Sequence, residues 1–347
     1  MNRLLAVVST IAMTGLGAQA ARANDGPFVC PPTPEPVVSL SYGSRYTAES
    51  ESRSDIDEDS NAAVNAALAP IETFIRDLVR IANDVTAGER DQMTQADCVI
   101  DQLATWAEAD ALSELGSYTA QLSVGSRLAG LAMIYKQVAP YSSNPAKRLV
   151  FKDWLAARTE EQMLFWEQDA TSGARLGNLR GWATLGINLS AEINDDPVAL
   201  RWSAWSASLM QCEAREDGSL PQETRRGKYA LHYQLHAIAP MVVTTLLLEQ
   251  QGLSIKGICD NALDRIVRFA LDDLETGEAS RAYSGEVQSY FDGTEELRSF
   301  QLAWLEAYLA LSWDPELDAF AEGLRPLGHS KLGGSQALLW GTASPTD

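Results

Sequence analysis

From Asn61 onward, the apolar residues of this chain recur at three- and four-residue spacing almost without interruption. One such stripe consists of Ile71, Phe74, Ile75, Leu78 and Ile81. This spacing is typical of an amphipathic helix that buries one face. The sequence offers no convincing alternation of apolar and polar residues, which is the pattern of a half-buried strand. The chain is therefore predicted to be all-α.

Several helix starts are marked. Asn144 precedes Pro145 and Asp196 precedes Pro197, and each pair offers a side-chain cap followed by a proline at the first helical position. We expect helices over 61–87, 92–113, 117–139, 145–169, 177–193, 197–214, 224–251, 257–274, 296–312 and 315–322. Because the links are short, consecutive helices should form antiparallel hairpins. Nested hairpins favour a toroid with a central cleft, and a superhelical solenoid is the alternative.

The chain before Asn61 differs in character. Residues 1–23 resemble a secretory signal, with Arg3, an apolar run from Leu4 to Leu16 and a small-residue cleavage site at Ala18-Gln19-Ala20 or Ala21-Arg22-Ala23. We therefore expect an exported, periplasmic protein that does not span a membrane. Residues 24–60 are rich in proline, serine and acidic groups and are expected to form a mobile arm or lid. Residues 61–347 are then a single helical domain.

Four cysteines suggest covalent cross-links. Cys30, Cys98, Cys212 and Cys259 form an even set in a chain expected to enter an oxidising compartment, and no CxxC metal motif occurs. Two disulfides are therefore expected. The spacing leaves all three pairings open.

The formal net charge of −20 excludes nucleic acid and anionic membranes as the main partners, because phosphate binding needs a clustered positive field. A polyanion would bind only in a cleft of reversed sign. Basic residues are indeed bunched, at Arg175, Arg180, Arg225, Arg226 and Lys228. A solvated helix face is the alternative explanation of that cluster.

Arg226 and Tyr233 are seven residues apart, close to two helical turns, so on one helix they would lie on the same face. A cation beside a phenol favours phenolate, which would make Tyr233 a usable base. His236 falls on the same face. Ordinary hydrogen bonding of a buried histidine is the alternative for His236.

Other candidate sites are less specific. Trp182, Trp202 and Trp205 stand near Arg180 and suit either a sugar-binding surface or, for Trp202 and Trp205 especially, the core. His232 and His236 have zinc-chelating spacing but lack the glutamate of a metalloprotease helix. Asp217 and Glu223 offer a carboxylate pair for a glycosidase. Neither a metal nor a cofactor is expected.

Several segments together resemble the periplasmic alginate lyases, the poly(β-D-mannuronate) lyases of polysaccharide lyase family 5. They are Cys30-Pro31, Ser44-Arg45-Tyr46, Asp97-Cys98, Trp304-Leu305-Glu306, Lys331-Leu332-Gly333-Gly334 and, most specifically, the stretch from Asn178 to Tyr233. The resemblance implies an incomplete toroid of helical hairpins and β-elimination from a uronate polysaccharide. It also implies that Cys30 pairs with Cys98, which leaves Cys212 with Cys259.

The resemblance implies roles for individual residues. Tyr233 matches the family's acid and base, and Arg226 matches the arginine beside it. Asn178 and Trp182 match the second asparagine and the tryptophan of the motif Asn-Asn-His-x-Tyr-Trp. The remaining substrate contacts are expected from Arg180, facing the carboxylate with Asn178, and from Arg45, Tyr46, His236 and Lys331.

Leu179 stands where the family has its active-site histidine. Removing one electrostatic stabiliser costs about 10²–10³ in rate, so we expect a weak lyase that acts as a monomer. The alternatives are a glycan-binding or export-associated protein without turnover, and a glycosidase using Asp217 and Glu223.

Overall fold

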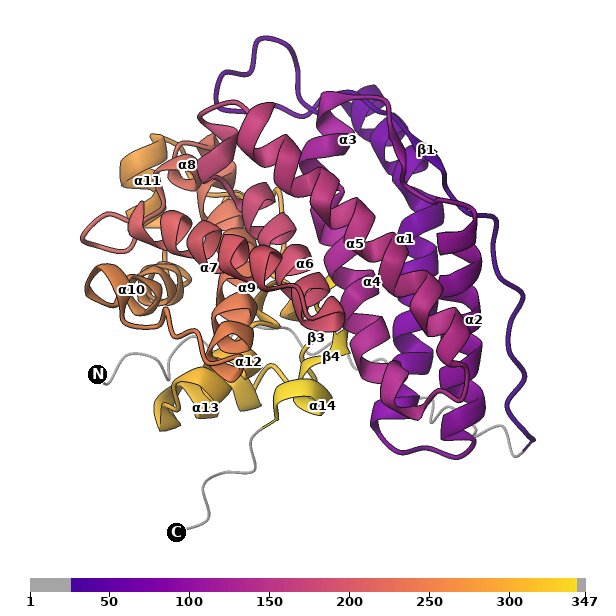
Figure 1. The fold of residues 1–347 in the computed structure, drawn as a ribbon. Helices are drawn as coiled ribbons and strands as arrows, with labels where there is room; N and C mark the ends of the chain where they lie inside the picture. The colour runs from indigo at the N-terminus through magenta and orange to yellow at the C-terminus, as the bar shows by residue number, and fades with distance from the viewer. Residues whose placement is uncertain (1–25, 342–347) are drawn as a thin grey trace.

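The computed structural model of the chain describes residues 26–341 and is almost entirely helical (Figure 1). The longer helices are α1 (Glu58–Thr86), α2 (Gln92–Glu108), α4 (Gly125–Val138), α5 (Pro145–Gln168), α6 (Asn178–Asn194), α7 (Pro197–Cys212), α9 (Ala230–Gln250) and α10 (Ile258–Asp273). The shorter ones are α3 (Tyr118–Ser123), α8 (Pro221–Thr224), α11 (Glu278–Ser284), α12 (Leu305–Leu311), α13 (Pro315–Glu322) and α14 (Gln336–Trp340). The all-α prediction is confirmed.

Short elements connect the helices. Five 3₁₀ turns are found in the described chain, η2 (Ala139–Tyr141), η3 (Ala174–Leu176), η4 (Gly227–Tyr229), η5 (Ser299–Leu302) and η6 (Ser330–Leu332). Strand β1 (Ser39–Leu40) pairs in parallel with β2 (Glu114–Leu115), and β3 (Gly328–His329) pairs antiparallel with β4 (Gly334–Ser335). Each strand has two residues, so these pairs fasten segments and form no layer.

The helices form two nested rows. In the inner row, α1, α4, α6, α9 and α12 pack one against the next, and their hairpin partners α2, α5, α7 and α10 lie outside them. The C-terminal segment, with η6, β4 and α14, packs against α1, α4 and α12, between the two ends of the row. This arrangement is the expected incomplete toroid of hairpins.

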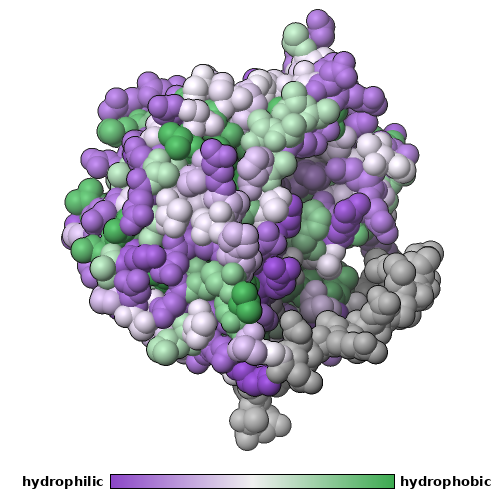
Figure 2. All heavy atoms as spheres, turned by 90° about the vertical axis from the view of Figure 1, so that its right-hand side faces the viewer, coloured by the Kyte–Doolittle hydropathy of each residue, from purple (hydrophilic) through white to green (hydrophobic). Residues whose placement is uncertain are grey.

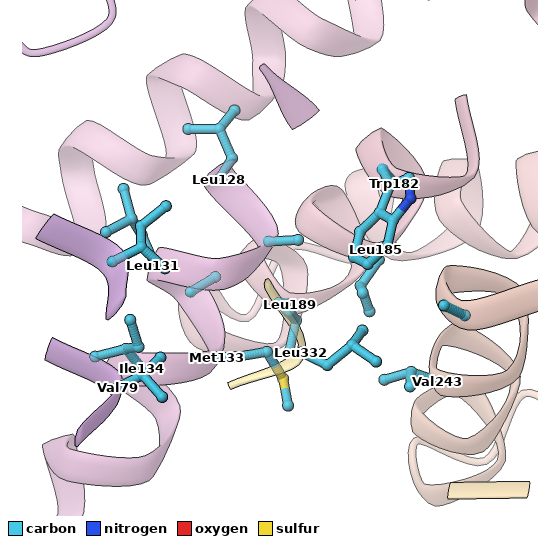
Figure 3. Packing of buried hydrophobic residues seen from close by; sticks show 14 of the residues in the cluster. Val79, Leu128, Leu131, Met133, Ile134, Trp182, Leu185, Leu189, Val243 and Leu332 are labelled. Atoms are coloured by element: carbon cyan, nitrogen blue, oxygen red, sulfur yellow. The ribbon is translucent and has the colours of Figure 1, made fainter. Parts of the chain in front are cut away.

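Large apolar side chains of α4 and α6 meet Val243 of α9 and Leu332 of the C-terminal segment in the core (Figure 3). Gly125 lies so close to α6 that a Cβ atom there would be 2.6 Å from Cα of Ala183. The segment Gly227–Gln250 is long and apolar enough to cross a membrane, but 83% of its most apolar window is buried inside the protein. Helix α9 is therefore the central core helix of the toroid.

Four expected helices differ in the structure, and the one expected over 296–312 is divided into η5 (Ser299–Leu302) and α12 (Leu305–Leu311). The helix expected over 92–113 stops at Glu108, since Asp110 and Leu112 have φ of 53° and 60°, which breaks a right-handed helix. The one expected over 117–139 is divided into α3 and α4. The one expected over 224–251 begins only at Ala230, because Gly227 has φ of +52° and interrupts the helical path.

The N-terminal arm lies along the outside of α2 and then crosses toward α8 (Figure 1). Both disulfide pairings are confirmed, Cys30 with Cys98 and Cys212 with Cys259. The first attaches the arm to α2, and the indole N–H of Trp106 donates to the carbonyl of Pro34 at 3.1 Å. Further along, Tyr46 and Ile56 form an antiparallel bridge that closes a loop. The signal segment lies outside the described residues.

The face of the molecule drawn in Figure 2 is mainly hydrophilic, with apolar side chains scattered between polar ones. Such a mixture is usual for a surface in contact with water. The large apolar side chains are instead gathered between the helices, where they hold the inner row in place.

Candidate active site

Arg226 and Tyr233 lie together, as predicted, but for a different reason. They are not on one helix, because Arg226 precedes the turn that begins α9. The arm holds the guanidinium instead: its Nε donates to the carbonyl of Ser52 at 3.0 Å and its Nη2 to that of Arg53 at 3.2 Å. Cζ of Arg226 is 3.8 Å from the centroid of the Tyr233 ring. The guanidinium therefore covers the face of the phenol.

Tyr46 of the arm covers the hydroxyl of Tyr233. The two phenol oxygens are hydrogen-bonded to each other, and Nη2 of Arg226 donates to the Tyr46 hydroxyl at 3.4 Å. Polar groups thus surround the Tyr233 hydroxyl, although the arm shields it from solvent.

Burial raises the pKa of Tyr233 above its ordinary value of 10.0. Arg226 acts in the opposite direction, and the hydrogen bond with Tyr46 adds to the increase. Arg226 lowers the pKa as expected, but in this closed arrangement its effect is smaller than that of burial. Desolvation of the phenolate outweighs the attraction of the guanidinium.

Asn178 begins α6 and donates two hydrogen bonds to Glu223. Its backbone N–H and its side-chain Nδ2 donate to the two carboxylate oxygens at 2.7 and 2.8 Å. Glu223 is buried, and burial raises the pKa of its carboxyl group, with Arg226 and Asn178 opposing that increase. Asn178 therefore meets a carboxylate of the protein itself, and its buried Oδ1 has no hydrogen-bond partner among the described residues.

The carboxylate pair proposed for a glycosidase is separated. Asp217 accepts hydrogen bonds from Ser219 and Tyr283 and lines a surface cleft of about 380 Å³ beside α10. Glu223 instead lies with Asn178 at the start of α6. The two acids do not face a common cleft, which removes the geometric basis of that alternative.

His232 and His236 lie beside Tyr233 and share one pocket with His329. They line a pocket of about 40 Å³ together with Leu235, Ala239, Phe300 and Gln301. His232 is paired with Glu295 at 3.1 Å, and the rings of His232 and Tyr233 have centroids 5.1 Å apart. No group of three or more metal-ligating side chains within residues 26–341 is arranged to hold a metal ion.

Trp182 packs against two of the histidines that line this pocket. Its side chain is only 1% exposed, its Nε1–H donates to Nε2 of His236 at 3.1 Å, and its ring stacks on His329 at a centroid distance of 5.4 Å. The expectation that Trp182 packs on a sugar ring is wrong for this structure, because the indole is enclosed by α9 and β3.

Lys331 and Arg127 share one carboxylate near the same pocket. Nζ of Lys331 is 3.0 Å from Glu72, and Nε of Arg127 donates to Glu72 at 2.9 Å. Two cations with one anion leave a local excess of positive charge within an acidic protein. Arg45 lies at the other end of the site, where its Nη1 donates to Asn61 at 2.8 Å.

A sequence model of the alginate lyase family matches residues 127–280. The chain is 24% identical over 302 residues to an alginate lyase of Pseudomonas putida (strain W619), which covers 85% of this chain and 80% of that protein. For an alginate lyase of Azotobacter vinelandii the identity is 24% over 323 residues, covering 90% and 84%. The chain therefore contains an alginate lyase family domain and is similar to alginate lyases over most of its length.

Solved structures of alginate lyase A1-III have the same fold as this chain. Alginate lyase A1-III from Sphingomonas species A1 superposes with a TM-score of 0.69 at 21% identity, covering 88% of this chain and 86% of that one. A variant of alginate lyase A1-III complexed with tetrasaccharide superposes with a TM-score of 0.75 at 21% identity, covering 93% and 88%. These similarities confirm the fold.

Arg180, which was also expected in the site, lies elsewhere. Arg180 is 1% exposed and faces the outer row, where it donates to Ser206 at 2.8 Å and pairs with Glu167 at 3.0 Å. Two residues after Asn178 on α6, it points away from the site. Its guanidinium is 4.9 Å from the ring centroid of Trp205, and Trp205 is 47% exposed, so the core prediction for Trp205 is also wrong.

Leu179 packs against an apolar cluster that contains Phe165, Trp166, Ala170 and Ala183. A leucine at this position thus contributes to packing between α5 and α6. His329 was missed by sequence reasoning, since it lies in a short strand far from the helical motifs. The only available signal was the count of three histidines in the whole chain.

Proposed function

We propose that this protein is a polysaccharide lyase that cleaves a uronate-containing, alginate-like polysaccharide by β-elimination, with Tyr233 as base and then acid. The alginate lyase family domain over residues 127–280 and the similarity to alginate lyases support the reaction class. The observation that carries the assignment of Tyr233 is the Arg226 guanidinium 3.8 Å from the ring centroid of its phenol, since an adjacent cation favours the phenolate that proton removal requires.

In the proposed reaction, the Tyr233 phenolate accepts the proton from C5 of a uronate unit. The C4–O bond then breaks, a C4–C5 double bond forms, and the phenol returns the proton to the departing glycosidic oxygen. Negative charge builds on the uronate carboxylate during proton removal and must be neutralised by donors or cations. His236, Lys331 and Arg45 are the candidates for that task and for holding the neighbouring sugar units.

The arm is proposed to move when the polysaccharide binds. The Tyr46 hydroxyl is hydrogen-bonded to the Tyr233 hydroxyl, and this bond raises the pKa of the Tyr233 phenol. Displacing Tyr46 by a substrate hydroxyl would remove this contribution. Arg226, which bonds to carbonyls of the same arm, would then act on a phenol that is free to lose its proton. We further propose that the protein is an exported periplasmic monomer.

Tyr233→Phe tests the proposal. The ring and its contact with Arg226 remain, but the proton-transferring oxygen is lost, so turnover of polymannuronate should fall about 10²–10⁴-fold. The ultraviolet absorbance of the unsaturated product measures turnover directly. Tyr283→Phe, at the cleft beside α10, is the matched control and should retain activity. Undiminished turnover in Tyr233→Phe would exclude the mechanism.

A glycan-binding protein without turnover is the second candidate, favoured by Leu179 and by the raised pKa of Tyr233. It predicts binding of polymannuronate, polyguluronate or glucuronan with no unsaturated product at any pH.

A further inference from the structure

All three histidines of the 347-residue chain line one pocket, and no carboxylate side chain lines it with them. The pocket lies between α9, which carries His232 and His236, and the C-terminal strand β3, which carries His329. Its rim includes Phe300, which is 45% exposed. An exposed aromatic ring beside polar donors suits a sugar unit that bears a polar group.

The tautomer of His236 follows from its partner. An indole N–H only donates a hydrogen bond, and the Trp182 indole donates to Nε2 of His236. Nε2 therefore carries no proton, and the proton of the neutral ring is on Nδ1. No partner of Nδ1 is found among the described residues, so this N–H remains available to a ligand.

The tautomer of His329 follows in the same way. The backbone N–H of Lys331 donates to Nδ1 of His329 at 3.1 Å, and a backbone N–H likewise only donates. The proton of the neutral His329 ring is therefore on Nε2. Within the described chain, Nε2 also has no hydrogen-bond partner.

Both rings are neutral near pH 7. Burial lowers the pKa of His329 to about 3, with Lys331 contributing and Glu72 opposing. Burial also lowers the pKa of His236 well below 6.5, and the surrounding charged or titratable groups add to that decrease, namely His232, His329, Lys331 and Arg127. Glu295 is the carboxylate that pairs with His232, at 3.1 Å.

We propose that His236 and His329 form a subsite for the carboxylate of a uronate unit, which binds through Nδ1–H of His236 and Nε2–H of His329. Lys331 and Arg127 lie near this pair and share one counter-ion, Glu72. The net positive charge makes the pocket favour an anion over a neutral hydroxymethyl group. The identity of the ligand rests on the proposed function. The assignment of the two donor nitrogens is independent of that function, because it follows from the hydrogen bonds made by Trp182 and by the backbone N–H of Lys331.

Paired substitutions test which nitrogen donates. An asparagine amide reproduces the position of Nδ1 and a glutamine amide that of Nε2. In a Tyr233→Phe background, His236→Asn and His329→Gln should bind a mannuronate tetrasaccharide within a few-fold of the parent in calorimetry. His236→Leu and His329→Leu, which lose the donor, should each bind about 10- to 100-fold more weakly. The carboxyl-reduced tetrasaccharide is the control ligand and should respond little to either leucine change.

Unchanged affinity in both leucine variants, or an equal loss for the carboxyl-reduced ligand, would overturn the subsite. If the subsite fails while Tyr233→Phe still abolishes turnover, the lyase proposal stands. If the native protein yields no unsaturated product but the leucine variants lose affinity, the subsite stands and the lyase proposal fails.

Nitrogen NMR of the unmodified protein covers the case in which a variant does not fold. Ring nitrogen shifts distinguish the two neutral tautomers, and a chain with three histidines gives few signals to assign. We expect one Nδ1–H ring and one Nε2–H ring at pH 7, and both should shift when the tetrasaccharide is added. Charged rings, or rings that ignore the tetrasaccharide, would contradict the proposal.

Discussion

At Tyr233, two opposing effects act on one phenol. Removal from water disfavours the phenolate, and the Arg226 guanidinium on the ring face favours it. With the arm in place the first effect is larger, so the phenol holds its proton. Tyr233 becomes a base only when its pKa falls. Among the described residues, Arg226 is the cation that lowers this pKa.

Arg226→Ala should therefore lower activity by about tenfold or more at neutral pH, because losing the cation raises the pKa of Tyr233 further and each unit reduces the phenolate fraction tenfold. Since phenolate forms as pH rises, the pH–rate profile of the native enzyme should increase into the alkaline range. The profile of Arg226→Ala should be displaced to higher pH.

Arg225→Ala is the matched control. Arg225 is exposed and does not contact the Tyr233 ring, so its substitution removes the same charge without removing the contact. If Arg226→Ala and Arg225→Ala give the same pH–rate profile as the native enzyme, Arg226 does not tune the phenol.

Among the helices, the crossing of α4 and α6 determines where the site residues lie. Helix α6 carries Asn178 at its first turn and Trp182 one turn later, so any displacement of α6 moves both. The backbones approach most closely at Gly125, where a Cβ atom would meet backbone atoms of Ala183 at 2.6–2.7 Å. Backbone atoms cannot rotate away as a side chain can, so this contact tolerates no added methyl group.

Gly125→Ala should consequently lower the free energy of unfolding by about 1–3 kcal/mol, the usual range for overpacking a core, and reduce turnover because α6 is pushed from its place. Denaturant unfolding and product absorbance measured on the same preparation check both effects. Gly43→Ala, where the added Cβ meets nothing within 4 Å, should change neither. Native-like stability in Gly125→Ala would show that the two helices can separate without cost.

Across the whole molecule, Glu72 joins the first inner helix to the end of the chain. It pairs with Arg127 of α4 and Lys331 of η6 and so holds the C-terminal segment that carries His329. Burial alone would raise the pKa of Glu72, but Arg127 and Lys331 outweigh it and the pKa lies below 4.5. A lowered carboxyl pKa contributes stability above the unfolded-state value, and this contribution is lost as pH falls through the folded-state value.

Glu72→Gln should cost about 3 kcal/mol at neutral pH, because it leaves two largely buried cations without a counter-charge. Below about pH 4.5 the difference from the native protein should shrink, since protonation removes the same charge there. Thermal unfolding measured across this pH range provides the comparison. Glu278→Gln, in an exposed pair with Arg281, is the control and should have little effect. If the stability difference between Glu72→Gln and the native protein were the same at all pH values, the ionised Glu72 would not be the source of this stability.

The sequence by itself determined the helical elements of this protein, because apolar spacing, caps and prolines act within a few residues of one another. The starts of α5 and α7 at Pro145 and Pro197 are as predicted. The family resemblance implied both disulfides. The resemblance also placed Arg226 beside Tyr233. In the structure the turn at Gly227 and the arm bring the two residues together, whereas the spacing argument had assumed one continuous helix.

Only the tertiary structure decided which way the remaining side chains face. Arg180 and Trp182 stand on one helix beside Asn178, yet the outer helix α7 encloses the first and the histidine pair encloses the second. His329 joins His236 from 93 positions later in the chain. A helix's own periodicity defines its faces, but which neighbour covers each face depends on contacts between distant segments, and no local pattern encodes those contacts.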